Sequence, residues 1–461
     1  MQIEMSSLSY GHENSLDEEH YASVLSCLRY LPLISEPEKC DIQLLDVVST
    51  SVIKENKHTF THSEAFESHV SESPKTDTRI ISICSRNSIS PLQITKQALL
   101  KVMSLYGIDN SFFDMVYSFG DKPRISDAGL GEMKMKQRAD GSYDMQYLLV
   151  YADGYKAQGS IKWTVRQIGV FHRYYPSGKG DIWIFLHAKP GSKVQRQLEA
   201  RIAQYLETLY NYWFSLHSLV LSSYLANWRW RIRGLGEELE KSADIALTRD
   251  LSRSEDVDQN VLFELLKPQH LGDVLLPLSS WMGVTLATTD KMKETNDLFY
   301  SKGLLAESDY QRILDELASH KANLEGHIRS IGVLERKAQG ISDLLAVALS
   351  QKNQAVTISI NQSMLDLTNE GFDENATVKV VTLVTLIYLP ASFVSTVLGM
   401  NMFDFADGGK FLISPQFWIF VVLAVPLTLL TLAMWYLVTK RKLKHRERKK
   451  VKVKAQGEES V

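Results

Sequence analysis

The stretch STVLGMNMFDF, residues 395–405, ends a long apolar run and decides the fold that the sequence predicts. From residue 378 to residue 402 the only charged side chain is that of Lys379. About 25 residues at a helical rise of ~1.5 Å cover the ~30 Å hydrocarbon core of a bilayer. A second run, 417–438, has no charge and is bordered by Trp418 and Trp435, as interfacial anchors would be. We therefore expect two membrane-spanning helices, since soluble core helices rarely stay free of charge for so long.

Flanking charge predicts the orientation of these spans. The chain of 461 residues has a net charge of -3, yet residues 440–454 contain ten Lys and Arg residues and one acidic residue. Basic flanks stay on the cytoplasmic side, and two spans return the chain to its starting side. Both termini are therefore expected in the cytoplasm, with the spans in a plasma or vacuolar membrane. The first residues are acidic and lack an apolar segment, unlike a secretory signal or a transit peptide.

The sequence suggests an α+β membrane protein with seven parts. The expected parts are a disordered tail (1–30), a cytoplasmic α/β domain (31–190), a helical stalk or bundle (191–377), the first span (378–402), an outer loop (403–416), the second span (417–438) and a basic cytoplasmic tail (439–461).

One stripe of the first span carries small and hydroxyl-bearing side chains. They recur at steps of three and four residues, at Thr382, Thr385, Leu389, Ser392, Thr396 and Gly399. Such a stripe suits tight helix packing in lipid, and it equally suits the lining of a water-filled pore. Two spans cannot enclose a pore alone, so the second interpretation requires several copies of the chain.

The triplet Gly399, Met400 and Asn401 lies at the outer end of the first of two C-terminal spans, and there it resembles the signature of the CorA-type magnesium channel family. The stretch NATVKVVTLVTLIYLPASF (375–393) is also similar to that family. The pattern Trp-x-x-Arg-Gln at 163–167 resembles the fungal CorA-like group. The resemblance implies a homopentamer in a lipid bilayer. It would transport Mg²⁺ down the membrane potential, with intracellular Mg²⁺ as the gating ion and no organic cofactor.

The resemblance also implies roles for individual residues. The implied selectivity filter is Gly399, Met400 and Asn401; the pore lining and gate are Asn375, Val378, Val381, Thr385, Leu389, Ser392 and Thr396; the acidic outer mouth is Asp404 and Asp407; the regulatory metal ligands are Asp343, Asp366, Asp373 and Glu374. A ring of Asn401 carboxamides would accept hydrogen bonds from the waters that magnesium retains.

Two departures from the family pattern keep other functions open. Leu398 stands where an aromatic residue usually precedes the triplet, and MFDFADGG replaces a loop that commonly contains Met-Pro-Glu. Transport of zinc, cobalt or nickel is one alternative. Another is a membrane-anchored sensor or interaction protein that kept the architecture and lost transport.

The N-terminal region predicts an α/β domain. Strand-like runs occur at 43–49, 79–85, 145–153 and 180–188, and they alternate with helical segments such as 91–107. Residues 163–187 predict two strands paired around the turn PSGKG.

Two long helices are expected after this domain. One covers residues 194–246; its NWRWRIRG segment (227–234) indicates a helix face or a membrane-proximal contact more than a nucleic-acid site, so no nucleic acid is expected. The other is a stalk helix that continues into the first span. Its seven-residue repeat predicts a coiled-coil seam, or else the buried stripe of an ordinary bundle helix, through Leu317, Leu324, Ile331, Ala338 and Leu345.

No pattern of catalytic residues is present, so an enzyme is not expected. His58 and His62 stand four residues apart without a third ligand, and a solvated loop is the expected setting for both. The three cysteines lack metal-site spacing.

Overall fold

The structure is a computed structural model. It describes residues 32–48, 54–72, 78–157, 159–176, 180–200, 213–248, 259–397, 403–406, 410–413, 415 and 417–458. The chain divides into two compact units, Met1–Leu349 and Ser350–Val461, and each is described by itself.

A seven-stranded sheet organises the first unit. Its strands are β2 (Ile42–Val48), β3 (Lys54–Phe60), β4 (Thr78–Cys84), β6 (Lys134–Gln137), β7 (Tyr143–Ala157), β8 (Ser160–Tyr174) and β9 (Asp181–His187). They lie in the order β3-β2-β4-β9-β8-β7-β6. All neighbours are antiparallel except β4 and β9, which are parallel. The four predicted strands and the β8–β9 pairing are confirmed.

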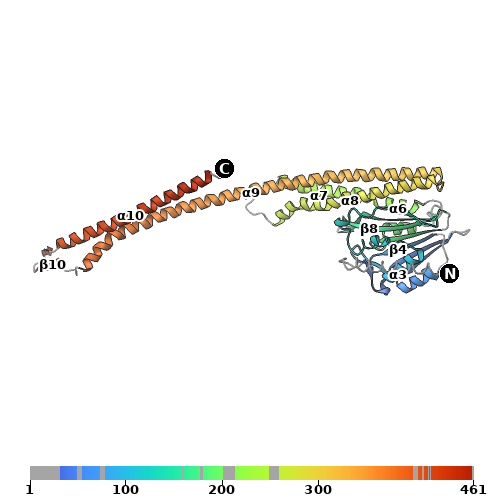
Figure 1. Ribbon diagram of the computed structural model, residues 1–461, viewed down its shortest axis with the longest axis horizontal. Helices are drawn as coiled ribbons and strands as arrows, with labels where there is room; N and C mark the ends of the chain where they lie inside the picture. Colours follow the sequence, from blue (N-terminus) through green and yellow to red (C-terminus); the bar gives the residue numbers. More distant parts are fainter. Residues whose placement is uncertain are drawn as a thin grey trace, which may run out of the picture. The chain divides into compact units, whose positions relative to one another are not determined.

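Helices cover both faces of this sheet (Figure 1). On one face lie α2 (Ser63–Glu72), α3 (Lys96–Tyr106) and α4 (Phe112–Val116), and on the other lie α6 (Ser215–Tyr224), α7 (Ala226–Thr248), α8 (Gln259–Ser301) and the first part of α9 (Glu307–Val397). Successive strand residues point to opposite faces, so Ile80 and Ile81 of β4 belong to two different cores. A strand buried on both faces carries apolar side chains on successive residues, as Ile80 and Ile81 do here, although Arg79 and Ser82 interrupt the run.

The seven-residue repeat of α9 is buried inside one chain. Leu317, Leu324, Ile331, Ala338 and Leu345 are at most 6% exposed and belong to the core shared with the sheet and with α6 to α8. Polar contacts flank the seam, including Ser279 to Glu335 at 3.3 Å and Lys337 to Glu240 at 3.4 Å. The repeat therefore packs as a bundle helix, and α9 also continues unbroken to Val397, as the stalk prediction required.

Two helix predictions were wrong in part. Residues Leu92–Thr95 form strand β5, parallel to β1 (Leu33–Ile34), so α3 begins only at Lys96. The β-branched Ile94 and Thr95 favour the strand, and the Thr95 hydroxyl accepts the N–H of Ala98 as a helix cap.

The expected helix over 194–246 is also interrupted. A turn at 213–214 precedes α6, and Leu225 separates α6 from α7. Trp213, Phe214 and Trp228 are fully buried around these breaks, and we attribute the changes of direction to their packing.

The second unit contains the end of α9, a β-hairpin and α10 (Phe417–Glu458). The hairpin pairs β10 (Phe403–Ala406) with β11 (Lys410–Ile413). Two segments are long and apolar enough to cross a membrane, Val378–Thr396 with mean hydropathy 1.8 and Phe417–Leu437 with 2.4. They contact each other, since the Thr431 hydroxyl donates to the Leu386 carbonyl at 3.4 Å.

Candidate functional site

The first span has one face that α10 covers and one that it leaves open. Pro390 and Val394 are buried and Leu386 is half-buried, and these three lie four residues apart on the side that meets α10. At about 100° per residue, the predicted pore stripe falls on a different side of the helix. Its members are exposed in the single chain, at Val378, Val381, Thr385, Leu389, Ser392 and Thr396.

The threonines of this open face satisfy their own hydrogens. The hydroxyls of Thr382, Thr385 and Thr396 each donate to the carbonyl four residues earlier, at 2.7, 2.8 and 2.8 Å. Each hydroxyl oxygen keeps lone pairs that can accept further hydrogen bonds. The open face therefore offers acceptors between the apolar side chains of Val378, Val381 and Leu389.

The signature triplet lies outside the described residues. Gly399, Met400, Asn401 and Asp407 have no described position, so their roles stay predictions. Asp404 lies in β10 opposite Leu412. Asn375 lies within α9, where its side chain is outside the description.

The structure describes the side chains of two of the four predicted regulatory carboxylates. Asp343 and Asp366 are exposed on α9, and Asp343 accepts a hydrogen bond from Gln339 at 2.8 Å. Asp373 and Glu374 also belong to α9, with side chains outside the description. Among the described residues, no group of three His, Cys, Asp or Glu side chains could hold a metal ion. The role of the four carboxylates as regulatory ligands therefore stays a prediction.

Of the two histidines of the N-terminal region, His62 is placed as expected and His58 is not. His58 lies within strand β3 and not in a loop, with its ring 4.5 Å from that of His69. His62 is exposed in the bend that follows β3. Like the rest of the described chain, this pair belongs to no metal-ligand group.

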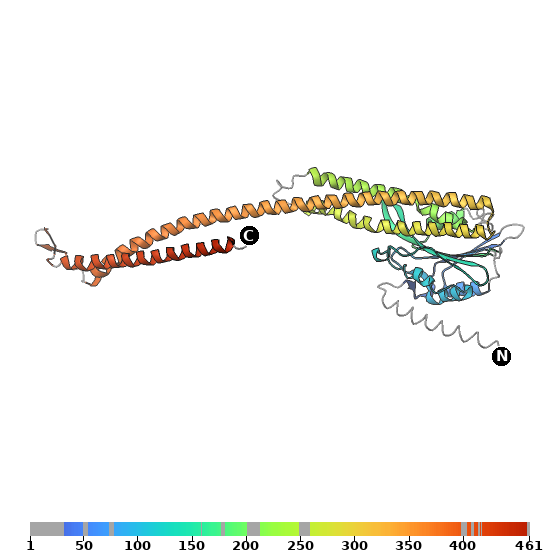
Figure 2. The same cartoon turned by 45° about the horizontal axis from the view of Figure 1, so that its top comes forward.

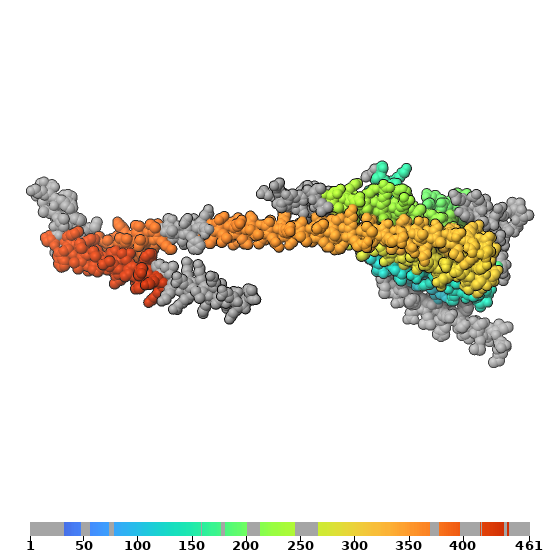
Figure 3. Space-filling model, turned by 90° about the horizontal axis from the view of Figure 1, so that it is seen from above, coloured from blue at the N-terminus to red at the C-terminus, as the bar shows by residue number. Residues whose placement is uncertain are grey.

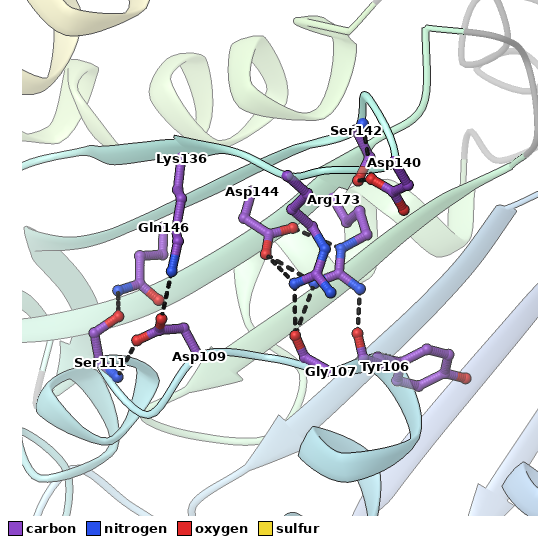
Figure 4. A network of polar contacts seen from close by, with 11 residues as sticks. Tyr106, Gly107, Asp109, Ser111, Lys136, Asp140, Ser142, Asp144, Gln146 and Arg173 are labelled. Carbon is purple, nitrogen blue, oxygen red and sulfur yellow. Dashed lines mark hydrogen bonds and ion pairs between the residues drawn. The ribbon is translucent and has the colours of Figure 1, made fainter. Parts of the chain in front are cut away.

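Sequence reasoning missed a charged network at the end of α3 (Figure 4). The Arg173 guanidinium binds both oxygens of Asp144 on the neighbouring strand, at 2.6 and 2.7 Å. Arg173 and Arg138 also donate to the carbonyl of Gly107, at 3.3 and 2.7 Å. These contacts tie the C-terminal end of α3 to the sheet. Opposite charges at the paired positions Asp144 and Arg173, each beside an apolar stretch of its strand, were the available signal.

A second ion pair in Figure 4 holds the segment that follows α3. Lys136 donates to Asp109 at 2.8 Å, and this hydrogen bond lowers the pKa of Asp109 to about 2. Both side chains are exposed, so the pair contributes little to stability. Its role is to orient the segment at the edge of the sheet.

Comparison with known families gives two matches along the chain. Residues 18–247 match the family model of CorA-like transporters, and residues 280–442 match that of the CorA-like Mg2+ transporter protein. A comparison with curated protein sequences returns no match.

Three solved structures are similar at low identity. The soluble domain of CorA from Methanocaldococcus jannaschii is 14% identical, with a TM-score of 0.33, and the match covers 67% of this chain and 95% of that one. The full-length CmaX protein is 12% identical, with a TM-score of 0.38 and coverage of 88% and 99%. The ZntB cytoplasmic domain from Vibrio parahaemolyticus RIMD 2210633 is 10% identical, with a TM-score of 0.36 and coverage of 66% and 98%. Values this low support no statement about function.

The two family matches lie one after the other along the chain. The first covers the sheet and the helices up to α7, and the second covers most of α8, all of α9 and both candidate spans. Because together they account for most of its length, the chain belongs to the CorA-like transporters.

Proposed function

We propose that this protein is a homopentameric divalent-cation channel and that magnesium is the ion it carries into the cytoplasm. The observation that carries the proposal is the open face of the first span. α10 covers the opposite side, so the stripe through Thr385, Leu389 and Ser392 is free to meet other copies or water. Closing several copies around an axis would turn this stripe into a pore lining.

The chemistry of the stripe suits a hydrated cation. Magnesium loses its waters reluctantly, and those waters donate hydrogen bonds. The threonine oxygens can accept them, because the hydroxyl hydrogens are held by the helix backbone. The proposed filter, a ring of Asn401 carboxamides, would accept at the outer end, with Asp404 and Asp407 attracting cations there. A potential of 100 mV would drive a divalent ion inward with about 4.6 kcal/mol.

Gating is assigned to the cytoplasmic end of the same helix. The apolar side chains of Val378, Val381 and Leu389 would form constrictions that close by dewetting. We place the regulatory magnesium sites between subunits, at Asp343, Asp366, Asp373 or Glu374. The exposure of Asp343 and Asp366 in one chain supports that location.

The test is divalent uptake by the full-length protein in liposomes. Asn401→Ala and Gly399→Ala are expected to abolish Mg²⁺ uptake while leaving the amount of folded protein unchanged. Asn110→Ala, an exposed position in the α/β domain, is the matched control and is expected to transport normally. If both filter variants transport like the unmodified protein, the pore assignment fails.

The second candidate is a membrane-anchored sensor or interaction protein that lost transport, favoured by Leu398 before the triplet and by the altered loop after it, and zinc transport is the third. The same liposomes loaded for Zn²⁺ flux distinguish the two ions. A folded protein that carries neither ion would indicate a sensor or interaction protein.

A further inference from the structure

Three buried polar side chains and the partly buried Asp181 form one hydrogen-bonded chain between the sheet and α6. The Tyr147 hydroxyl lies 3.0 Å from His217 Nδ1, His217 Nε2 lies 3.1 Å from His172 Nδ1, and His172 Nε2 lies 3.3 Å from Asp181 Oδ2. Tyr147, His172 and Asp181 come from β7, β8 and β9, and His217 comes from α6. Both imidazoles are fully buried and Tyr147 is 2% exposed.

The direction of these hydrogen bonds is determined by the carboxylate. Ionised Asp181 can only accept, and its other oxygen already accepts the N–H of Tyr175 at 3.0 Å. A neutral His172 must therefore donate from Nε2 to Asp181 and accept at Nδ1. His217 then donates from Nε2, and its Nδ1 accepts the Tyr147 hydroxyl. With both histidines neutral, this is the arrangement that satisfies all three bonds.

One added proton reverses the bond between the two histidines and the bond between His217 and Tyr147. Whether the proton resides on Asp181 or on His172, the Nδ1 atom of His172 now carries hydrogen and must donate to His217 Nε2. His217 must then carry its hydrogen on Nδ1 and donate to the Tyr147 oxygen. The hydroxyl hydrogen of Tyr147 is left without an acceptor among the described residues. An unmade buried hydrogen bond costs about 1–3 kcal/mol, so α6 and β7 have a reason to separate slightly.

We propose that this chain is a proton-binding site whose occupancy alters the contact between the sheet and α6, and through α6 the position of α9. The neighbour of His217 on α6, Ser218, donates a hydrogen bond to Glu316 of α9. Glu316 in turn lies 3.5 Å from His320. α9 is the helix that carries the first span. Proton control of ion flux therefore rests on the proposed function, whereas proton binding does not.

Among the described residues, neither a lysine nor an arginine pairs with Asp181. In the described chain its only ion-pair neighbour is His172, while the nearby Asp144 is already bound by Arg173. Tyr143, Tyr174 and Lys302 also face this region, and Lys302 donates to the Tyr143 hydroxyl at 2.7 Å.

Burial shifts the pKa values of the two histidines and of Asp181 in opposite directions. It lowers the pKa of His172 and His217 and raises the pKa of Asp181 to about 7. An unpaired buried carboxylate is costly, so proton uptake near neutral pH is the physical expectation.

Trp183 provides a direct optical readout. Its indole stacks on the His172 ring, with centroids 3.6 Å apart and planes at 11°. Proton uptake changes either the charge or the tautomer of the imidazole that stacks on this indole, so the emission of Trp183 should change. The full-length protein in nanodiscs is therefore expected to show a one-proton step in tryptophan emission as the pH falls. Trp183→Phe should remove this step while the other tryptophans still emit.

Two variants test the hydrogen-bonded side chains that run from Tyr147 to Asp181. Asp181→Asn cannot take up the proton, so the step should disappear. Tyr147→Phe removes the hydroxyl, so His217 Nδ1 has no partner in either protonation state. The protonated state then no longer carries an extra unmade hydrogen bond, and the step should move to higher pH. If one variant fails to fold, the other still decides. A step that keeps its wild-type midpoint in every folded variant overturns the proposal.

Flux measurements separate this proposal from the pore assignment. Divalent uptake in liposomes should change with cytoplasmic pH over the range of the fluorescence step, and Tyr147→Phe should shift both together. A fluorescence step without any flux in any variant contradicts the pore and leaves proton binding supported. A flux whose pH dependence ignores Tyr147→Phe overturns the coupling to α9.

Discussion

His187 makes the stability of the α/β domain sensitive to acid. It ends β9, is 1% exposed, and its Nδ1 lies 3.1 Å from the Ser192 hydroxyl. Its Nε2 has no hydrogen-bond partner among the described residues. Burial lowers the pKa of this imidazole to about 3. The ring is therefore neutral in the folded protein at every pH at which an unfolded histidine becomes charged.

The magnitude follows from proton linkage. An unfolded histidine has a pKa of about 6.5, so below that pH the unfolded chain binds a proton that the folded chain does not. Because the folded pKa is lowered, the stabilisation is present above pH 6.5 and is lost as the pH falls toward 3. Each pH unit costs about 1.4 kcal/mol, and the change from pH 7 to pH 5 costs about 2 kcal/mol for this one residue.

The assay compares His187→Gln with the unmodified full-length protein by urea unfolding at several pH values. Glutamine cannot ionise at this position, so the unfolding free energy of the variant should fall less steeply with acid. Between pH 7 and pH 5 the variant should lose about 2 kcal/mol less than the unmodified protein. This difference in slope is independent of any constant loss caused by the substitution. His62→Gln, at an exposed position, should leave the slope unchanged. Parallel pH profiles for His187→Gln and the unmodified protein would refute the reasoning.

Two further substitutions, each with a control variant, test packing by urea unfolding. Gly131→Ala should destabilise by about 1–3 kcal/mol, because Gly131 has φ +107 and an added Cβ would lie 2.9 Å from the backbone oxygen of Leu148 in β7. At Gly129 an added Cβ meets no described atom within 4 Å, so Gly129→Ala should change little. Leu324→Ala should cost about 2–5 kcal/mol because Leu324 is fully buried in the α9 seam. Leu344→Ala, at a position that is 58% exposed, should cost under about 0.5 kcal/mol.

The parts of the fold that depend on local composition were predictable. A membrane span can be recognised in the sequence by its length and its absence of charge. Strand β4 can be recognised by neighbouring apolar residues, because it is buried on both faces. The repeat through Leu324 and Ile331 was also visible. Its partner was not, because the same buried stripe serves a helix of another chain or one of the same chain.

The contacts that define the buried polar sites could not be predicted from spacing. His172 and His217 are 45 residues apart and meet because α6 lies on the sheet beside β8. The parallel placement of β9 beside β4 decides which residues are neighbours of Asp181, and no local pattern fixes that order. Strand existence is a local property, whereas strand order is a property of the whole chain.

The stretch of α9 between the bundle and the span exposes several large apolar side chains. Ile358, Met364 and Leu367 are between 58% and 67% exposed, and Figure 3 shows this stretch, in orange, uncovered on the face in view. Large apolar side chains in such a row are rarely left exposed to water, so another apolar surface is expected to cover them. This agrees with an assembly of several copies and gives no information about the ion.

The hydroxyls of the first span cannot identify a pore by themselves. Thr385 and Thr396 bond their own backbone, and a threonine so satisfied is tolerated against lipid as well as against water. A carboxamide is different, because its two donors and its acceptor cannot all be satisfied by its own helix. At the predicted end of the first span, Asn401 would therefore require water, an ion with its waters, or a neighbouring subunit. For this reason a substitution at Asn401 discriminates between the pore and simple helix packing, and a substitution at Thr385 does not.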